Sequence, residues 1–224
     1  MHISDCNNVD DMRNLAKKKL PKPVFHYIDG GADDEVTYKN NTTAFNNYEL
    51  IPNVLKNVSN INTKVNVLGV NINIPFFCSP TALQKLFHYN GEMAVAKAAE
   101  KENTMFGVSS LSTTSVEEIA KIIKSPKLFQ LYYHKDRGLN NDMIERAKEA
   151  KFDALALTVD TIVGGNRERD LKTGFTIPPK LSFNSFLSFI FHPEWTLNFL
   201  LRKFDLPHLS KLNNKGSSFQ VSVS

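Results

Sequence analysis

A short apolar segment recurs along the chain and limits the folds that this sequence can adopt. Residues 154–157 (ALAL) form an unbroken apolar run that stops at Thr158 and Asp160, and comparable runs begin near residues 75, 104 and 128. Runs this short, without polar alternation, are typical of strands buried on both faces of a parallel sheet. Their spacing of about 24 to 29 residues leaves room for one helix between successive strands. The pattern therefore predicts an α/β fold with four successive βα units.

The residues before the first predicted strand have a different pattern. Apolar spacing, prolines and a Gly-Gly pair predict helices over residues 9–20, 24–29 and 33–46. Residues 65–74 alternate polar and apolar side chains around Gly69, which predicts a small hairpin of the kind that plugs one end of a barrel.

Helices are also expected between the predicted strands. They are predicted over residues 91–102, from Ser115 onward, and over residues 141–150. Glu118 follows Ser115 by three residues, so the two side chains are expected to form a capping box at the start of their helix.

Uncharged hydrogen-bonding side chains mark the ends of the four predicted strands. They are Ser79 and Thr81, Ser109 and Ser110, Gln130 and Tyr132, and Thr158. Parallel strands present their ligand sites at their carboxyl ends, and hydroxyl, amide and phenol groups suit the flat polar edge of a cofactor ring. Helix capping is the alternative explanation, and it accounts for Ser115 and Ser109. Capping does not explain Gln130 and Tyr132, which stand inside an apolar strand.

Composition narrows the partners that we expect. The formal net charge is +4 and opposite charges are interleaved, so no nucleic-acid partner is predicted. Two cysteines, Cys6 and Cys78, form no disulfide framework, and the first residues lack a secretion signal, so a cytoplasmic location is expected. No metal site is predicted.

One stretch raises the question of a membrane. Residues 183–201 are apolar and aromatic but are interrupted by His192, Pro193 and Glu194. The stretch is too short and too polar to span a bilayer. It is compatible with a peripheral position on the inner face of the cell membrane, or with a packed or disordered connection.

Five segments together resemble a known enzyme family. They are residues 20–35 (LPKPVFHYIDGGADDE), 79–88 (SPTALQKLFH), 109–118 (SSLSTTSVEE), 129–138 (FQLYYHKDRG) and 157–170 (LTVDTIVGGNRERD). In this order they resemble the FMN-dependent α-hydroxy acid dehydrogenase/oxidase family. Two pieces, FHYIDGGA at residues 25–32 and HPEW at residues 192–195, look most like the respiratory L-lactate dehydrogenase branch.

The resemblance implies a TIM (β/α)8 barrel with FMN at its C-terminal face. By similarity, Pro80, Thr81 and Ala82 would face the flavin, and Ser109, Gln130 and Thr158 would hydrogen-bond its ring. Tyr27 and Arg167 would bind the substrate carboxylate, Arg167 through two parallel bonds. Tyr132 would polarise the substrate hydroxyl, and Asp160 would orient a catalytic imidazolium. Without the resemblance, Tyr27 reads as a core tyrosine and Arg167 as part of a solvated charge cluster.

The implied reaction is oxidation of an L-2-hydroxy acid, L-lactate in the first place, to the 2-oxo acid. A quinone, a cytochrome or oxygen would reoxidise the flavin, and the complete enzyme is expected to be a homo-oligomer. Position 111 is Leu where glycolate oxidases have Trp, which favours a substrate other than glycolate.

Only the N-terminal part of such a barrel is expected here. Residues 1–74 correspond to the N-terminal helices and hairpin, 75–170 to barrel units one to four, and 171–224 to the loop after strand four. The family's histidine motif (Ser-Asn-His-Gly-Gly-Arg) has no match, so this chain alone is expected to bind FMN weakly and to be inactive. Two alternatives stay open: another FMN barrel enzyme, such as a flavin-dependent isopentenyl diphosphate isomerase, and a non-catalytic half-barrel completed by a partner chain.

Overall fold

The computed structural model describes residues 2–161, 163–175, 180, 182–202 and 204–210. It forms two compact units, each built from two stretches of the chain. The first unit comprises Met1–Ile61 and Gly164–Leu201, and the second comprises Asn62–Val163 and Arg202–Ser224. The two units are described separately below.

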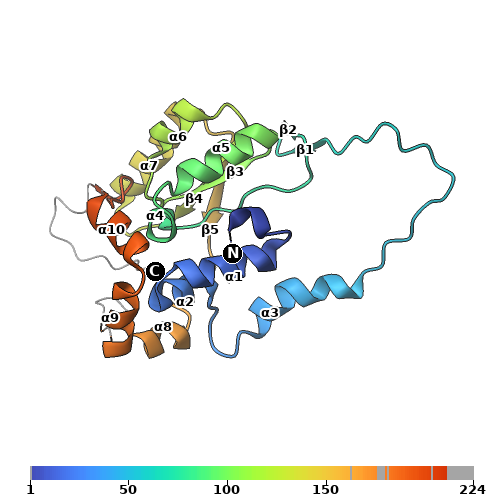
Figure 1. The fold of residues 1–224 in the computed structure, drawn as a ribbon. Helices are drawn as coiled ribbons and strands as arrows, with labels where there is room; N and C mark the ends of the chain where they lie inside the picture. Colours follow the sequence, from blue (N-terminus) through green and yellow to red (C-terminus); the bar gives the residue numbers. More distant parts are fainter. Residues whose placement is uncertain (1, 162, 176–179, 181, 203, 211–224) are drawn as a thin grey trace. The chain divides into compact units, whose positions relative to one another are not determined.

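The first unit is helical (Figure 1). Its elements are η1 (Ile3–Asp5), α1 (Val9–Lys19), α2 (Lys22–Asp29), α3 (Val36–Thr43), η2 (Ala44–Asn47), α8 (Glu168–Thr173), α9 (Phe183–Ile190) and α10 (Pro193–Leu201). The three N-terminal helices predicted from the sequence are therefore present. The third begins later than predicted because Glu35 precedes it in the left-handed conformation, at φ 58°. It also breaks into α3 and η2.

The second unit contains a parallel sheet of three strands in the order β3 (Phe106–Ser109), β4 (Lys127–Tyr132) and β5 (Ala154–Thr158). Its helices are α4 (Gln84–Phe87), α5 (Glu92–Glu102), α6 (Val116–Ile122) and α7 (Arg137–Glu149). The capping box of α6 is confirmed, since Glu118 N donates to Ser115 Oγ at 3.2 Å and Ser115 N donates to the Glu118 carboxylate at 3.0 Å. Helix α7 begins earlier than predicted because Asp136 caps it, accepting from Leu139 N at 3.1 Å.

The strand predicted at residues 75–79 is reduced to one isolated bridge, between Cys78 and Phe106. Cys78 N donates to Met105 O at 3.1 Å, and Gly107 N donates to Cys78 O at 2.8 Å. Prolines stand at both ends of this run, at positions 75 and 80, and proline has no N–H to extend a ladder. The segment therefore follows the edge of β3 without forming a regular strand.

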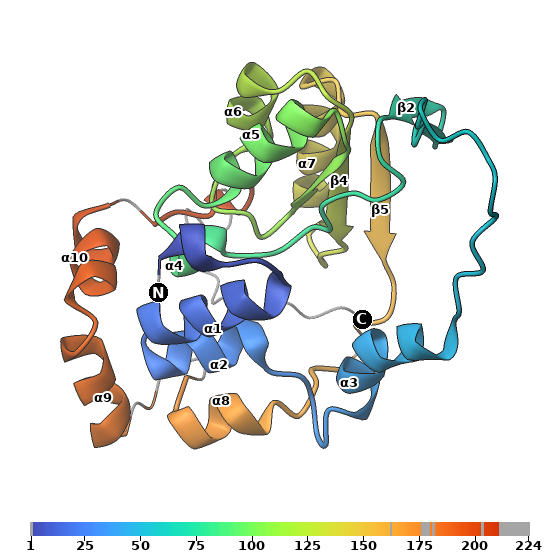
Figure 2. The same cartoon turned by 45° about the vertical axis from the view of Figure 1, so that its right-hand side comes forward.

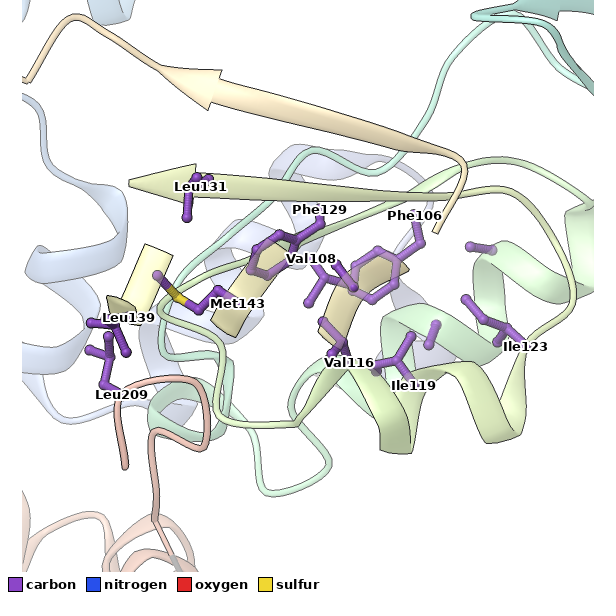
Figure 3. Close-up of a cluster of buried hydrophobic side chains, with 13 residues drawn as sticks. Phe106, Val108, Val116, Ile119, Ile123, Phe129, Leu131, Leu139, Met143 and Leu209 are labelled. Atoms are coloured by element: carbon purple, nitrogen blue, oxygen red, sulfur yellow. The ribbon is translucent and has the colours of Figure 1, made fainter. Parts of the chain in front are cut away.

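One face of the sheet carries the main core, and α5, α6 and α7 lie together on this side (Figures 1 and 2). Figure 3 shows Phe106, Val108 and Phe129 pointing from the strands toward side chains of α6 such as Val116 and Ile119. All five are fully buried. Burial of large apolar side chains on this face is the main force that holds the βα units together.

The opposite face is covered at one end by the hairpin β1 (Val65–Val67) and β2 (Val70–Ile72). Ile72 is buried together with Met105 and Leu128, next to apolar residues of both β1 and β5. The predicted hairpin is therefore confirmed and covers the face at the strands' N-terminal ends. Side chains two residues apart on a strand share a face, so the carboxyl ends of the same face carry Ser109, Gln130 and Thr158.

The outer edge of the sheet is at β5. Leu155 and Leu157 lie beside Phe129 and Leu131 in the strand register, yet they are 50% and 53% exposed. Among the described residues the parallel sheet stays open after β5, so the (β/α)8 barrel expected from the resemblance is present only as an open α/β portion.

Candidate functional site

A row of polar side chains crosses the carboxyl end of the parallel sheet. Ser109 Oγ donates to Gln130 Oε1 at 2.9 Å, and Gln130 Nε2 donates to Thr158 Oγ1 at 2.5 Å. Ser109 and Gln130 are buried, and Thr158 is half-buried. The strand register explains the row, because Ser109 lies beside Gln130 and Thr158 lies one pleat further along β5. The three side chains expected to hydrogen-bond a cofactor ring are thus in one hydrogen-bonded line.

The loop after β3 is tied to the same end of the sheet. Leu111 N donates to Ser109 Oγ at 3.1 Å, and Tyr132 N donates to Ser110 Oγ at 3.1 Å. Within the row, the hydroxyl proton of Thr158 and one amide proton of Gln130 are not used. These are donors of the kind that a ring carbonyl or an unprotonated ring nitrogen accepts.

Pro80, Thr81 and Ala82 closely follow Cys78, which forms a bridge with Phe106 of β3 on the side away from β4. A Cβ on Gly107 would lie 2.7 Å from Pro80 Cδ, so the glycine lets the proline approach the face that also carries Ser109. Thr81 is exposed, and its hydroxyl donates to Ser79 O at 3.4 Å. In the described part of the chain, the hydrogen bonds of the row do not extend to Thr81.

The predicted catalytic residues stand at the same strand ends. Tyr132 is the last residue of β4 and pairs with Thr158 in the register. Asp160 is exposed and follows the end of β5 by two residues. Both residues lie at the carboxyl end of the sheet, and their catalytic roles remain predictions.

The predicted substrate pair, Tyr27 and Arg167, is brought together within the first unit. The Arg167 guanidinium carbon lies 5.1 Å from the centre of the Tyr27 ring, and Arg167 Nη2 donates to the backbone oxygen of Tyr27. Arg167 Nε also pairs with Asp170 at 2.5 Å. Its side chain is 35% exposed, so Arg167 is neither a core residue nor a freely solvated charge.

A cluster of charges holds this pair in place. Asp29, at the end of α2, accepts from Arg13 at 2.5 and 3.0 Å and from Arg169 at 2.8 Å, while Arg169 also donates to Glu35 at 2.5 Å. Burial by itself would raise the pKa of Asp29, but the two guanidinium groups outweigh it and hold that pKa below its ordinary value. The cluster ties α8 to α2, which carries Tyr27.

Two further buried groups near the sheet are not singled out by the sequence. Glu92 accepts hydrogen bonds from the loop after β3, and His208 Nε2 accepts from Val116 N at 3.1 Å. An acid just after Gly91 at a helix start is a weak signal for Glu92. No local signal exists for His208, because its partner lies 92 residues away in the sequence.

The donor set of the row fits the cofactor ring expected from the resemblance. It consists of hydroxyl and amide groups in a line, on a face that the hairpin covers at its other end. A phosphate alone would call for cationic side chains or a helix N-terminus. Uncharged donors in a line instead match the alternating carbonyls and nitrogens of a flat heterocycle.

Comparisons with known proteins agree with these features. Residues 16–222 match the family model described as FMN-dependent dehydrogenase. The chain is 38% identical to glycolate oxidase of Spinacia oleracea over 218 residues, which cover 97% of this chain and 55% of that protein. It is 44% identical over 179 residues to glycolate oxidase 3 of Oryza sativa subsp. indica, covering 80% and 49%.

Solved structures show the same likeness. The monotopic membrane protein (S)-mandelate dehydrogenase superposes with a TM-score of 0.84 at 31% identity, over 98% of this chain and 61% of that one. A protein described as a lactate oxidase from Pediococcus acidilactici gives 0.73 at 33% identity, over 83% and 52%. The chain thus spans about half the length of the curated relatives it matches. On these sequence and structural grounds, the chain belongs to the family of FMN-dependent dehydrogenases.

Proposed function

We propose that the protein to which this chain contributes oxidises an L-2-hydroxy acid to the corresponding 2-oxo acid with FMN as its cofactor. The observation that carries this proposal is the row Ser109–Gln130–Thr158 at the carboxyl end of a parallel sheet, in a chain of this family. When bound, FMN supplies the acceptor for the two electrons that leave the substrate.

The side chains of this chain have separate roles in binding the cofactor, binding the substrate and catalysis. Ser109, Gln130 and Thr158 hold and orient the flavin ring through hydrogen bonds. Arg167 and Tyr27 bind the substrate carboxylate, and Tyr132 donates to the oxygen at carbon 2 as the alcohol becomes a ketone. Asp160 stabilises the cation of a histidine base, which has no counterpart in this chain. The substrate loses two electrons and two protons, and a quinone, a cytochrome or oxygen later takes the electrons.

L-Lactate is the substrate that we propose first. The motifs at residues 25–32 and 192–195 and the relative described as a lactate oxidase support it. Position 111 also lacks the Trp that the resemblance gives for glycolate oxidases. Its Leu packs, partly buried, against the main core. Other relatives are described as glycolate oxidases and mandelate oxidases, so the test must compare all three acids.

Anaerobic flavin reduction tests this proposal. With the complete protein expressed from its natural coding sequence, L-lactate is expected to bleach the oxidised flavin spectrum faster than glycolate or (S)-mandelate. Gln130→Leu is expected to weaken FMN binding by about 10- to 100-fold, because a buried amide that bonds the ring is lost. Asn66→Leu removes an exposed amide of the hairpin, which bonds Asn71 at 3.0 Å, and is the matched control.

The same measurement separates the alternatives. Absence of bleaching by any 2-hydroxy acid would contradict the proposal, and a spectral change with isopentenyl diphosphate alone would favour the isomerase. A non-catalytic half-barrel is favoured if FMN binding and turnover both require a separate partner chain and neither responds to Gln130→Leu.

We further propose that the segment of α9 and α10 contacts the membrane surface on its cytoplasmic side. Its apolar side chains are unusually open to solvent: Phe183 75%, Phe186 56%, Ile190 56%, Phe191 75%, Leu197 57%, Leu200 72% and Leu201 81%. Contiguous exposure of this kind marks membrane or protein contact sites. A relative described as a monotopic membrane protein supports the proposal. Among the described helices, none has the length and apolar character needed to cross a bilayer.

Sedimentation with lipid vesicles tests the membrane proposal. The protein is expected to sediment with vesicles of anionic lipid, and Phe186→Ser with Leu200→Ser to reduce the bound fraction several-fold, because about 2 kcal/mol of transfer free energy is lost per side chain. Leu171→Ser, at a 61% exposed leucine of α8, is the control. Equal binding of all three proteins would contradict the proposal.

A further inference from the structure

Glu92 is a fully buried carboxylate at the start of α5. It accepts four hydrogen bonds: from Gln84 N at 3.3 Å, Thr113 N at 2.8 Å, Thr113 Oγ1 at 2.6 Å and Thr114 Oγ1 at 3.0 Å. Burying a charge is costly unless it is well bonded, and these donors together with the positive end of the helix dipole meet that requirement. None of these donors belongs to α5, so the carboxylate bonds neighbouring segments and does not cap its own helix.

The partners of Glu92 belong to two different segments at the carboxyl end of the sheet, the start of α4 and the loop after β3. Gln84 follows the segment of Pro80, Thr81 and Ala82, and its side-chain amide donates to Thr81 O at 3.3 Å. Thr113 and Thr114 lie in the loop that follows Ser109 at the end of β3. The carboxylate therefore bridges two of the segments to which ring-facing residues are assigned, the one that follows Pro80 to Ala82 and the one that follows Ser109.

Lys85 supports the same bridge. Its backbone N donates to Thr113 Oγ1 at 3.2 Å, and its ammonium donates to Thr113 O at 3.1 Å. One more backbone bond joins the loops, from Leu83 N to Leu111 O at 3.1 Å. Thr113 is thus held from two sides, and its hydroxyl donates to the Glu92 carboxylate while it accepts from Lys85.

We propose that Glu92 is a positioning residue for the flavin ring site, fixing the segment of Pro80 to Ala82 against the loop after Ser109. The inference rests on the proposed function, because it assumes a ring bound at this end of the sheet. Glu92 does not touch the ring. It acts through the two loops, so its loss weakens ring binding by letting them move apart.

Glu92→Gln tests this role with little change of shape. The amide replaces one acceptor oxygen by an NH2 group that faces the donors of Thr113 and Thr114. Glu100→Gln is the matched control on the same helix. Glu100 also accepts backbone bonds, from Lys124 N at 2.8 Å and Ser125 N at 2.6 Å, but these precede β4 at the opposite end of the sheet.

Two readouts are combined, amide hydrogen exchange and the affinity for lumiflavin, a flavin ring that lacks the phosphate. Glu92→Gln is expected to speed exchange at Gln84 and Thr113 and to weaken lumiflavin binding about 10-fold or more. Glu100→Gln is expected to speed exchange at Lys124 and Ser125 and to leave lumiflavin affinity within about twofold. Thr114→Val removes one bond to Glu92 without changing the charge and is expected to give a smaller loss of affinity in the same direction.

The outcomes are distinct. Unchanged lumiflavin affinity in Glu92→Gln, or equal losses in both glutamate variants, would overturn the positioning role while leaving the flavin site intact. If Glu92→Gln does not fold, unchanged affinity in Thr114→Val overturns it. The measurements use the complete protein, and its failure to bind lumiflavin at about millimolar concentration without any substitution would overturn the ring site itself, and the proposal with it.

Discussion

His208 illustrates how a single buried side chain links distant parts of the chain. It is 1% exposed, accepts from Val116 N at the start of α6, and lies edge-on to Phe129 with ring centres 5.5 Å apart. Next to it, Arg146 donates to Pro207 O at 3.2 Å and pairs with Glu117. The residues after α10 are thereby fastened to the main core of the second unit.

Burial, followed by the nearby charge of Arg146, lowers the pKa of His208 from 6.5 to about 4. The unfolded chain binds this proton near pH 6.5 and the folded chain only near pH 4. Its contribution to stability is therefore complete above pH 6.5 and is lost as the pH falls toward 4. The largest contribution that this shift can make to the free energy of unfolding is roughly 3 kcal/mol, because each pKa unit corresponds to about 1.36 kcal/mol.

The difference between the original chain and His208→Gln isolates this effect. The variant is expected to be less stable to urea at pH 7.5. The difference in the free energy of unfolding between the two proteins is expected to narrow between pH 6.5 and 5, because glutamine does not titrate. The hydrogen bond to Arg146 lowers the pKa of Glu117 to about 2, so this pH window lies above the range in which Glu117 titrates. A constant gap across this window would show that His208 binds its proton equally in both states.

At the scale of elements, short local signals determine where the helices of the second unit begin. Helix α6 begins at a reciprocal cap between Ser115 and Glu118, and α7 at the Asp136 cap. Both helices bury one face against the sheet, so the caps determine which residues of each helix meet the core.

Removal of one cap tests this dependence. Ser115→Ala is expected to lower the free energy of unfolding of the second unit by about 1 kcal/mol, since the N–H of Glu118 loses its acceptor. Urea unfolding followed by circular dichroism measures the change. Lys121→Ala, at an exposed position of the same helix, is expected to change it by less than about 0.5 kcal/mol. Similar effects of both variants would mean that the cap contributes little.

At the scale of the whole molecule, large apolar side chains are unusually open to solvent. Leu155 and Leu157 of β5 are about half exposed, and residues 48–61 carry a series of apolar side chains, among them Leu50 at 97% and Leu55 at 101%. An open strand edge with apolar neighbours favours pairing with another chain.

The purified chain is accordingly expected to self-associate at micromolar concentration. Leu157→Lys is expected to shift light scattering toward the monomer, because a charge on the edge strand opposes edge pairing. Leu171→Lys places the same charge at a 61% exposed site on α8 and is expected to have little effect. Equal scattering from both variants would indicate that association does not involve β5.

Much of this architecture follows from local patterns. The apolar runs at residues 104–109, 128–132 and 154–159, the hairpin around Gly69 and the capping box are all recognisable in the sequence, because strand burial, turns and caps depend on neighbouring residues. The same patterns identify Ser109, Gln130 and Thr158 as polar groups at strand ends. The strand predicted at residues 75–79 is wrong as a regular strand, because its flanking prolines allow only one bridge with β3.

Local pattern alone thus decides the alternation of strands and helices and the chemistry at the strand ends. It does not decide which polar groups touch. Gln130 meets Thr158 only through the register of β4 with β5, and Glu92 and His208 find partners 21 and 92 residues away. Periodicity reports which face of an element is buried, whereas the partners of a buried polar group depend on how whole elements pack, and that information is spread over the entire chain.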